Sequence, residues 1–150
     1  MAKALLDSKK DCHIITLGLV PHHHEMYWNS VEDHVGKKSR ASRLSRWENE
    51  LSRVTFVCGD SREVLPKLGQ SRVHFAFLDG AHFKGDVLME FDYVSRRQRP
   101  GDSVFFDDVT PGQFDGIVEA LKTIEQRSDY IIEYLQSSPL RRYAWAKRVA

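Results

Sequence analysis

The sequence predicts an α/β protein with a doubly wound, mostly parallel sheet that ends in an antiparallel hairpin. Four apolar runs are typical of strands, at 12–20, 54–58, 73–78 and 103–108. None of them alternates strictly between apolar and polar residues, which favours strands that are buried on both faces of a parallel sheet. Segments with helical spacing separate the last three runs, so strand and helix alternate along the chain.

The predicted helices follow from the spacing of apolar residues in segments 61–68, 84–98 and 113–127. In the last two segments the apolar face consists of Val87, Phe91 and Val94, and of Ile117, Leu121 and Ile124. Segments 130–136 and 141–149 have the composition of a terminal antiparallel pair of strands. Segment 22–50 is the polar exception, with a predicted loop in its first half and a predicted helix in its second.

Composition narrows the classes of function. The chain has 150 residues, 41% hydrophobic and 29% charged, as expected for one soluble globular domain. A formal net charge of +1 gives no indication of a nucleic-acid or anionic membrane partner. No apolar run approaches the roughly 20 residues of a membrane helix. The first ten residues do not resemble a secretory signal, and Cys12 and Cys58 fit neither a disulfide framework nor a zinc site. We therefore expect a cytoplasmic protein.

Acidic side chains and a histidine follow three of the predicted strands: Asp60, Asp79 with His82, and Asp107 with Asp108. In doubly wound sheets, ligands bind outside the carboxyl ends of the strands. We therefore expect these residues to lie at one edge of the sheet.

This pattern suggests metal-assisted chemistry. Neighbouring strands lie about 4.8 Å apart, so Asp79 and the Asp107–Asp108 pair would be within reach of one cation. Hard carboxylate oxygens suit Mg²⁺, with Ca²⁺ and Mn²⁺ as alternatives. His82 follows on the same loop, and an imidazole is suited to act as a general base on a substrate hydroxyl.

Each of these residues, taken alone, also has an ordinary structural interpretation. Asp79 and Gly80 are a common turn pair, and Asp60 could cap the helix that follows it. The three histidines at 22–24 cannot all face one metal ion, so a solvated loop is favoured there. The basic start of segment 39–53 is better explained by a solvated helix face than by a nucleic-acid site.

The stretch FAFLDGAHFKGDVLMEFDYVSRRQRPGDSVFFDD (75–108) resembles the second half of a class I S-adenosylmethionine-dependent methyltransferase. The shared pattern is a strand, Asp-Gly-x-His, a helix, a Pro-Gly turn, a strand and Asp-Asp. It is most similar to the small-molecule O-methyltransferase branch that includes macrocin-type and cephalosporin-hydroxylase-like proteins. The resemblance covers residues 12–149 and is most specific over 73–108. It implies a single methyltransferase-like domain over 1–150 with a Rossmann-like class I fold.

The resemblance also implies roles for individual residues. His82 corresponds to the catalytic base, and Asp79 to a catalytic residue that contacts both metal and cofactor. Mg²⁺ would be bound by Asp79, Asp107 and Asp108. The cofactor, S-adenosylmethionine, would be contacted by Gly59, Asp60, Ser61 and Asp79. The implied reaction is methyl transfer to a hydroxyl group of a small-molecule acceptor.

The sequence departs from the family in its N-terminal part. Class I enzymes begin with a strand and a Gly-rich turn, and this chain is truncated relative to that pattern. The second strand of the family usually ends on an acidic residue, where this chain has Gly18. Three outcomes follow: runs 12–20 and 73–78 pair directly, a partner segment or a second copy supplies the missing strand, or the chain is part of a longer protein.

These departures leave several functions open. The chain could be an O-methyltransferase, or a non-catalytic or truncated module that does not bind the cofactor alone. A metal-dependent hydrolase could use Asp79, His82, Asp107 and Asp108. A nucleotide hydrolase is disfavoured because no Gly-x-x-x-x-Gly-Lys-Ser/Thr motif is present. Whether this chain is an active enzyme alone is not decided by the sequence.

Overall fold

The computed structural model describes residues 2–7, 11–138 and 141–150. The chain forms two compact units, Met1–Ser61 and Arg62–Ala150, which are described separately below. The organisation as a single domain stays a prediction. Within the described ranges, no helix has both the length and the apolar character that a bilayer crossing requires.

The first unit contains helix α1 (Ala2–Asp7) and a parallel pair of strands, β1 (Ile14–Gly18) and β4 (Val54–Cys58). Five consecutive residues of β1 pair in register with β4, from Ile14 opposite Val54 to Gly18 opposite Cys58. The segment between these strands forms a short antiparallel pair and three short helices: β2 (Glu25–Met26), β3 (Lys38–Ser39), η1 (Val31–Val35), α2 (Arg40–Leu44) and η2 (Ser45–Trp47). The predicted helical second half of segment 22–50 is confirmed for residues 40–47.

Trp28 organises the segment between β1 and β4. Its indole Nε1 donates a hydrogen bond to the Lys38 carbonyl at 2.6 Å. The guanidinium groups of Arg40 and Arg43 lie 5.8 and 5.9 Å from its ring centre. Asp33 accepts hydrogen bonds from the backbone N–H groups of Trp28 and Ser30, and the Ser30 bond is the main reason that its pKa is lowered. Trp28 therefore packs within its own segment, whereas Tyr27 and Trp47 are exposed.

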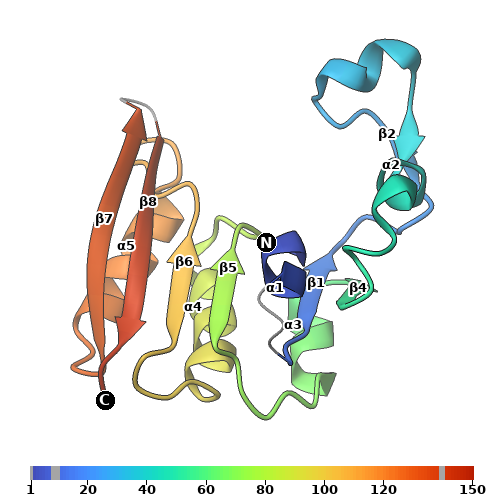
Figure 1. Cartoon of the computed structure of the whole chain (residues 1–150). Helices are drawn as coiled ribbons and strands as arrows, with labels where there is room; N and C mark the ends of the chain where they lie inside the picture. The colour runs from blue at the N-terminus through green and yellow to red at the C-terminus, as the bar shows by residue number, and fades with distance from the viewer. Residues whose placement is uncertain (1, 8–10, 139–140) are drawn as a thin grey trace. The chain divides into compact units, whose positions relative to one another are not determined.

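The second unit contains a four-stranded sheet in the order β5 (Phe75–Leu78), β6 (Ser103–Phe106), β8 (Arg141–Arg148), β7 (Tyr130–Ser138) (Figure 1). Strands β5 and β6 are parallel, and β8 is antiparallel to both β6 and β7. The helices are α3 (Ser61–Val64), which begins at the last residue of the first unit, η3 (Leu65–Lys67), α4 (Lys84–Ser95) and α5 (Asp115–Glu125). The predicted mixture of parallel strands and a terminal antiparallel hairpin is confirmed. Pro139 and Leu140, which lie between these two strands in the sequence, are outside the described residues.

The predicted strands fall into two sheets in the described part of the chain. β1 pairs with β4, and β5 pairs with β6. Runs 12–20 and 73–78 belong to different units, so their direct pairing stays a prediction. The directions of both parallel pairs agree with the predicted fold class.

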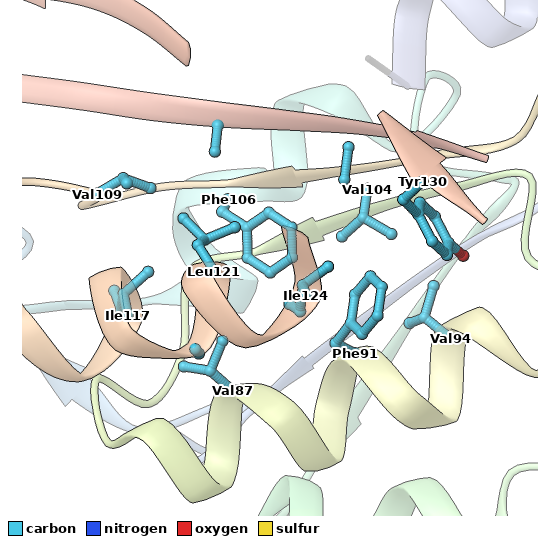
Figure 2. Close-up of a cluster of buried hydrophobic side chains, with 13 residues drawn as sticks. Val87, Phe91, Val94, Val104, Phe106, Val109, Ile117, Leu121, Ile124 and Tyr130 are labelled. Atoms are coloured by element: carbon cyan, nitrogen blue, oxygen red, sulfur yellow. The ribbon is translucent and has the colours of Figure 1, made fainter. Parts of the chain in front are cut away.

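Helices α4 and α5 cover one face of the four-stranded sheet, where the hydrophobic core lies (Figure 2). Both helices bury the apolar faces that their sequence spacing predicts, and the sheet contributes alternate residues of β6 and β8. The core residues are Val87, Phe91, Val94, Val104, Phe106, Val109, Ile117, Ala120, Leu121, Ile124, Tyr130, Ala144 and Ala146. This packing holds the carboxyl ends of β5 and β6 in place.

The opposite face of this sheet is more exposed than the sequence predicts. Phe75 and Phe77 on β5 are 44% and 48% exposed, and burial alternates along the strand. The Phe77 ring contacts Phe105 at 5.9 Å between ring centres, and Phe105 contacts Tyr143 at 5.4 Å. The expectation that β5 is buried on both faces is therefore wrong, because α4 and α5 cover only the face that carries Ala76 and Leu78.

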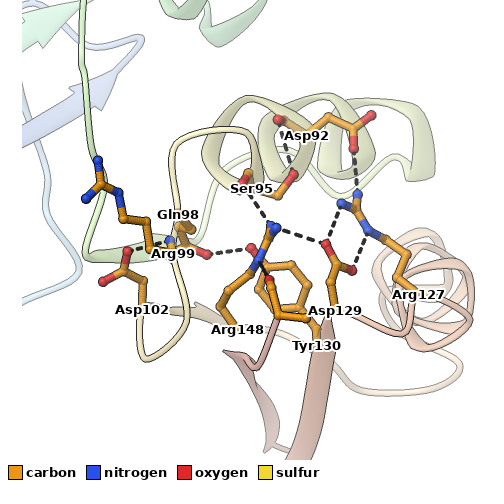
Figure 3. A network of polar contacts seen from close by, with 10 residues as sticks. Asp92, Ser95, Gln98, Arg99, Asp102, Arg127, Asp129, Tyr130 and Arg148 are labelled. Carbon is orange, nitrogen blue, oxygen red and sulfur yellow. Dashed lines mark hydrogen bonds and ion pairs between the residues drawn. The ribbon is translucent and has the colours of Figure 1, made fainter.

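A polar network ties the end of α4 to strands β7 and β8 (Figure 3). Asp129 accepts hydrogen bonds from Arg127, through Nε and Nη2, both at 3.1 Å. Arg148 lies 3.2 Å from the same carboxylate and donates to the Ser95 carbonyl at 3.1 Å. Arg127 also pairs with Asp92 on α4 at 3.1 Å. Asp129 therefore joins two arginines that contact α4.

We expect Asp129→Asn to destabilise the second unit by about 1–3 kcal/mol, because an amide leaves one arginine poorly paired. The hydrogen bond from Arg127 is the main reason that the pKa of Asp129 lies below its ordinary value of 3.8. A carboxylate whose pKa is lowered in the folded state stabilises the fold, and this contribution is complete when the pH is above the ordinary pKa. The contribution is lost as the pH falls through the folded-state pKa. Urea unfolding should be measured for wild type and variant in neutral and progressively more acidic buffer. The difference between their free energies of unfolding should become smaller as the pH falls.

Asp92→Asn is the matched control, since the Asp92 side chain is 52% exposed whereas that of Asp129 is 22% exposed. Its effect should be clearly smaller. A difference between wild type and Asp129→Asn that stays constant on acidification would contradict the assigned role of the carboxylate.

Candidate active site

The pairing of β5 with β6 brings the predicted site residues of the second unit together. Leu78 pairs with Phe106, the last residue of each strand, and the Asp107 N–H donates to the Leu78 carbonyl at 3.0 Å. Asp79 and Asp107 are the next residues on the two strands. The prediction that Asp79 lies beside the Asp107–Asp108 pair is therefore confirmed.

Asp107 is buried, with a side chain that is 6% exposed, and both of its carboxylate oxygens are engaged. Oδ1 accepts a hydrogen bond from the Asp108 N–H at 2.7 Å. Oδ2 accepts one from Nη2 of Arg141 at 2.7 Å. The ion pair with Arg141 compensates the burial of this negative charge.

Asp108 adopts a left-handed backbone conformation with φ of +55°, which costs roughly 1 kcal/mol for a residue with a side chain. The following residues are held by the start of β8: the Val109 N–H donates to the Arg142 carbonyl at 2.9 Å, and the Arg142 N–H donates to Thr110 Oγ1 at 3.3 Å. In this conformation Asp108 Oδ2 lies 3.3 Å from His82 Nε2. The residue with the strained backbone, Asp108, is therefore also the residue whose carboxylate pairs with the His82 imidazole.

His82 is positioned by the start of α5 as well as by its own loop. Its ring packs against Phe114, with 4.4 Å between ring centres. Its backbone contacts Gly116 so closely that a Cβ atom on Gly116 would overlap the His82 carbonyl oxygen and lie 2.9 Å from Lys84 N. Only a glycine at position 116 allows this approach without movement of the backbone.

Asp79 completes the acidic cluster, which we define as Asp79, Asp107 and Asp108. Partial burial is the main cause that raises the pKa of Asp79, and the negative charges of Asp107 and Asp108 raise it further. The positive charge of Arg141 and the neighbouring His82 act in the opposite direction. The cluster is therefore electrostatically coupled, and Arg141 is its nearby permanent cation.

The sequence interpretation missed three residues of this site. The sequence places Arg141 only in the hairpin, and nothing in its sequence context connects it to Asp107. Glu90 is buried on α4, and a Cβ atom on Gly80 would lie 3.4 Å from its Oε1. The position of Glu90 on the apolar face of α4, between Val87 and Val94, is the sequence feature that could have identified it as a site residue. Gly116 gave no signal beyond being a glycine in a helix.

The predicted cofactor residues Gly59, Asp60 and Ser61 lie at the carboxyl end of β4, in the first unit. Gly59 has a φ of 152°, and its N–H donates to the Gly18 carbonyl at 3.1 Å, which extends the pairing of β1 with β4. Because these residues belong to the first compact unit, their placement in one site with Asp79 stays a prediction.

The arrangement of the acidic cluster does not fit the predicted Mg²⁺ site. Over residues 2–7, 11–138 and 141–150, no group of three His, Cys, Asp or Glu side chains is placed to bind a metal ion. Both oxygens of Asp107 already accept hydrogen bonds, one of them from the cation Arg141. Asp79, Asp107 and Asp108 therefore lie together, as predicted, without forming the metal site that the sequence suggested.

Solved structures that resemble the chain define the class of fold. The O-methyltransferase TomG from Streptomyces achromogenes, in complex with SAM, is 20% identical, with a TM-score of 0.67 over 93% of this chain and 63% of that chain. Cofactor-bound Rv0187 from MTB is 17% identical, with a TM-score of 0.68 over 94% and 63%. The O-methyltransferase from Bacillus cereus in complex with SAH is 17% identical, with a TM-score of 0.62 over 91% and 63%. The chain thus has a Rossmann-like class I methyltransferase fold and spans 63% of the length of each of these structures.

The family follows from the sequence match. Residues 1–109 match the family described as "Methyltransferase domain", so the chain belongs to this methyltransferase family. The matched range includes Asp79, His82, Asp107 and Asp108. A search of curated proteins gave no significant match.

Proposed function

We propose that this chain carries out S-adenosylmethionine-dependent methyl transfer to a hydroxyl group of a small molecule. The observation that carries the proposal is the His82–Asp108 pair at the carboxyl ends of β5 and β6, in a chain of the methyltransferase family. Two of the structures that resemble this chain are named as O-methyltransferases, which supports oxygen as the methylated atom.

The pair can act as a general base. The Nε2 atom of His82 faces Asp108, so a proton on Nε2 is stabilised by the carboxylate, and Nδ1 is left to accept a proton from the acceptor hydroxyl. Bound S-adenosylmethionine supplies an electrophilic methyl group on a sulfonium sulfur. The hydroxyl proton passes to His82 while the hydroxyl oxygen forms its bond to the methyl carbon and the carbon–sulfur bond breaks. General-base catalysis of this kind contributes about 10²–10⁴-fold to the rate.

Gly59, Asp60, Ser61 and Asp79 are the residues that we propose for cofactor binding. Carboxylate and hydroxyl oxygens are suitable acceptors for the amino and hydroxyl groups of the cofactor. Gly59 has no side chain, so a ligand can approach the backbone closely at the end of β4, where φ is 152°. Metal assistance is not included in the proposed reaction, because the oxygens of Asp107 are already engaged.

A second candidate function is a methyltransferase-fold module that does not bind the cofactor by itself. Two features of the sequence favour it. The chain contains no Gly-x-Gly motif, and β1 ends at Gly18 where the family usually has an acidic residue.

Calorimetric titration with S-adenosylmethionine and S-adenosylhomocysteine separates the two candidates. We expect binding in the micromolar range, with or without Mg²⁺, and weaker binding by Asp60→Asn. Asp7→Asn, which changes an exposed aspartate on α1, is the matched control and should bind like wild type. Absence of binding by a chain whose circular dichroism shows it to be folded would favour the non-binding module.

A further inference from the structure

We propose that the guanidinium group of Arg141 is the built-in cation of the acidic cluster, and that the cluster is held in its working arrangement by this residue and not by a divalent metal ion. The inference rests on the proposed function, since the cluster belongs to the candidate active site. It also accounts for the mismatch between the acidic residues and a magnesium site.

The contact between Arg141 and Asp107 is the first support. The Asp107 side chain is 6% exposed, and a buried carboxylate is unfavourable unless it is paired and hydrogen-bonded. Nη2 of Arg141 provides that pairing at 2.7 Å, and the Asp108 N–H satisfies the other oxygen at 2.7 Å. The charge and the hydrogen bonds of Asp107 are therefore satisfied within the chain.

The fold places Arg141 next to the cluster. Arg141 is the first residue of β8, and it pairs with Ser138 of β7. Its guanidinium lies 5.4 Å from the ring centre of Tyr143, on the same strand. The carbonyl of the next residue, Arg142, accepts a hydrogen bond from the Val109 N–H, and the Arg142 N–H donates to Thr110 Oγ1, just after the cluster. The strand that carries Arg141 is therefore attached to the loop that carries Asp107 and Asp108.

A divalent ion and Arg141 would compete for Asp107. Mg²⁺ requires free carboxylate oxygens at about 2.0–2.1 Å in a near-octahedral arrangement. Binding through Asp107 would have to use an oxygen that already accepts a hydrogen bond, and it would bring the metal ion close to the guanidinium charge. Removal of the Arg141 charge should therefore make the cluster more available to a metal ion.

The test is a Mg²⁺ titration of wild type and Arg141→Gln, followed by thermal unfolding and calorimetry. The wild-type midpoint should be insensitive to Mg²⁺ up to about 10 mM, apart from a general salt effect that KCl at equal ionic strength reproduces. Arg141→Gln should have a lower midpoint without Mg²⁺ and should gain a saturable increase with Mg²⁺. Arg142→Gln removes a neighbouring guanidinium that lies 3.9 Å from the Tyr134 ring centre, and it should respond as wild type does.

Arg141→Lys keeps the positive charge and should not gain Mg²⁺ binding. Saturable binding of Mg²⁺ by wild type that Asp107→Asn removes would overturn the proposal, and this measurement does not depend on the folding of Arg141→Gln. A folded Arg141→Gln that binds Mg²⁺ no better than wild type would also overturn it. Because the titration needs neither cofactor nor acceptor, its result is independent of whether methyl transfer occurs.

Discussion

Replacement of His82 by alanine is expected to lower the rate of methyl transfer by about 10²–10⁴-fold, while the affinity for S-adenosylmethionine stays close to that of wild type. The reason is that a general base acts on the acceptor hydroxyl and not on the cofactor. His82 is suited to this role because its Nε2 lies 3.3 Å from Asp108 and its ring is packed against Phe114. The measurement combines S-adenosylhomocysteine release with calorimetric titration of the cofactor.

His74→Ala is the matched control for this variant. His74 is an exposed histidine just before β5, at the opposite end of that strand from Asp79. Its replacement should change neither the rate nor the affinity. If His82→Ala instead bound the cofactor much more weakly and kept its rate at saturating cofactor, the assignment of His82 as the base would be wrong.

Gly116→Ala should destabilise the second unit by about 1–3 kcal/mol and reduce methyl transfer at the same time. The added Cβ atom would overlap the His82 carbonyl oxygen and lie 2.9 Å from Lys84 N. Both neighbours are backbone atoms, so either α5 or the loop that carries His82 must move. Urea unfolding measures the first effect, and S-adenosylhomocysteine release measures the second.

Gly85→Ala, in the first turn of α4, provides the comparison. A Cβ atom on Gly85 would meet no atom within 4 Å, and alanine is favoured over glycine in helices by about 0.5–1 kcal/mol. This variant should therefore be as stable as wild type or slightly more so, with unchanged activity. Equal behaviour of Gly85→Ala and Gly116→Ala would show that the contact with His82 is not important for the site.

The parts of the fold that the sequence predicts correctly depend on local patterns. Val87, Phe91 and Val94 recur at helical spacing, and burial of that face against the sheet follows from it. The position of Asp79 beside Asp107 follows equally simply, because both residues come directly after neighbouring parallel strands. In each case the prediction needs only the chain near the residue and the geometry of the regular element.

The parts that the sequence does not predict depend on contacts between distant segments. Arg141 reaches Asp107 only because β8 inserts between β6 and β7, a topology that brings together residues 34 positions apart. Gly116 matters through one close backbone contact with His82, which no periodicity reveals. The sequence does not predict the exposure of Phe75 and Phe77 either, since an apolar run does not show whether both faces of its strand are covered.

The proposed methyl transfer is tested most directly by S-adenosylhomocysteine release from the wild-type chain, measured with a panel of hydroxyl-bearing small molecules in the presence and absence of EDTA. We expect release that depends on an acceptor, yields a methylated hydroxyl in equal amount, and is unchanged by EDTA. Transfer that stops in EDTA and returns with Mg²⁺ would contradict the role of Arg141 as the cation of the cluster. Hydrolysis of the panel compounds without cofactor, or no transfer to any acceptor by a chain that binds the cofactor, would contradict methyl transfer itself.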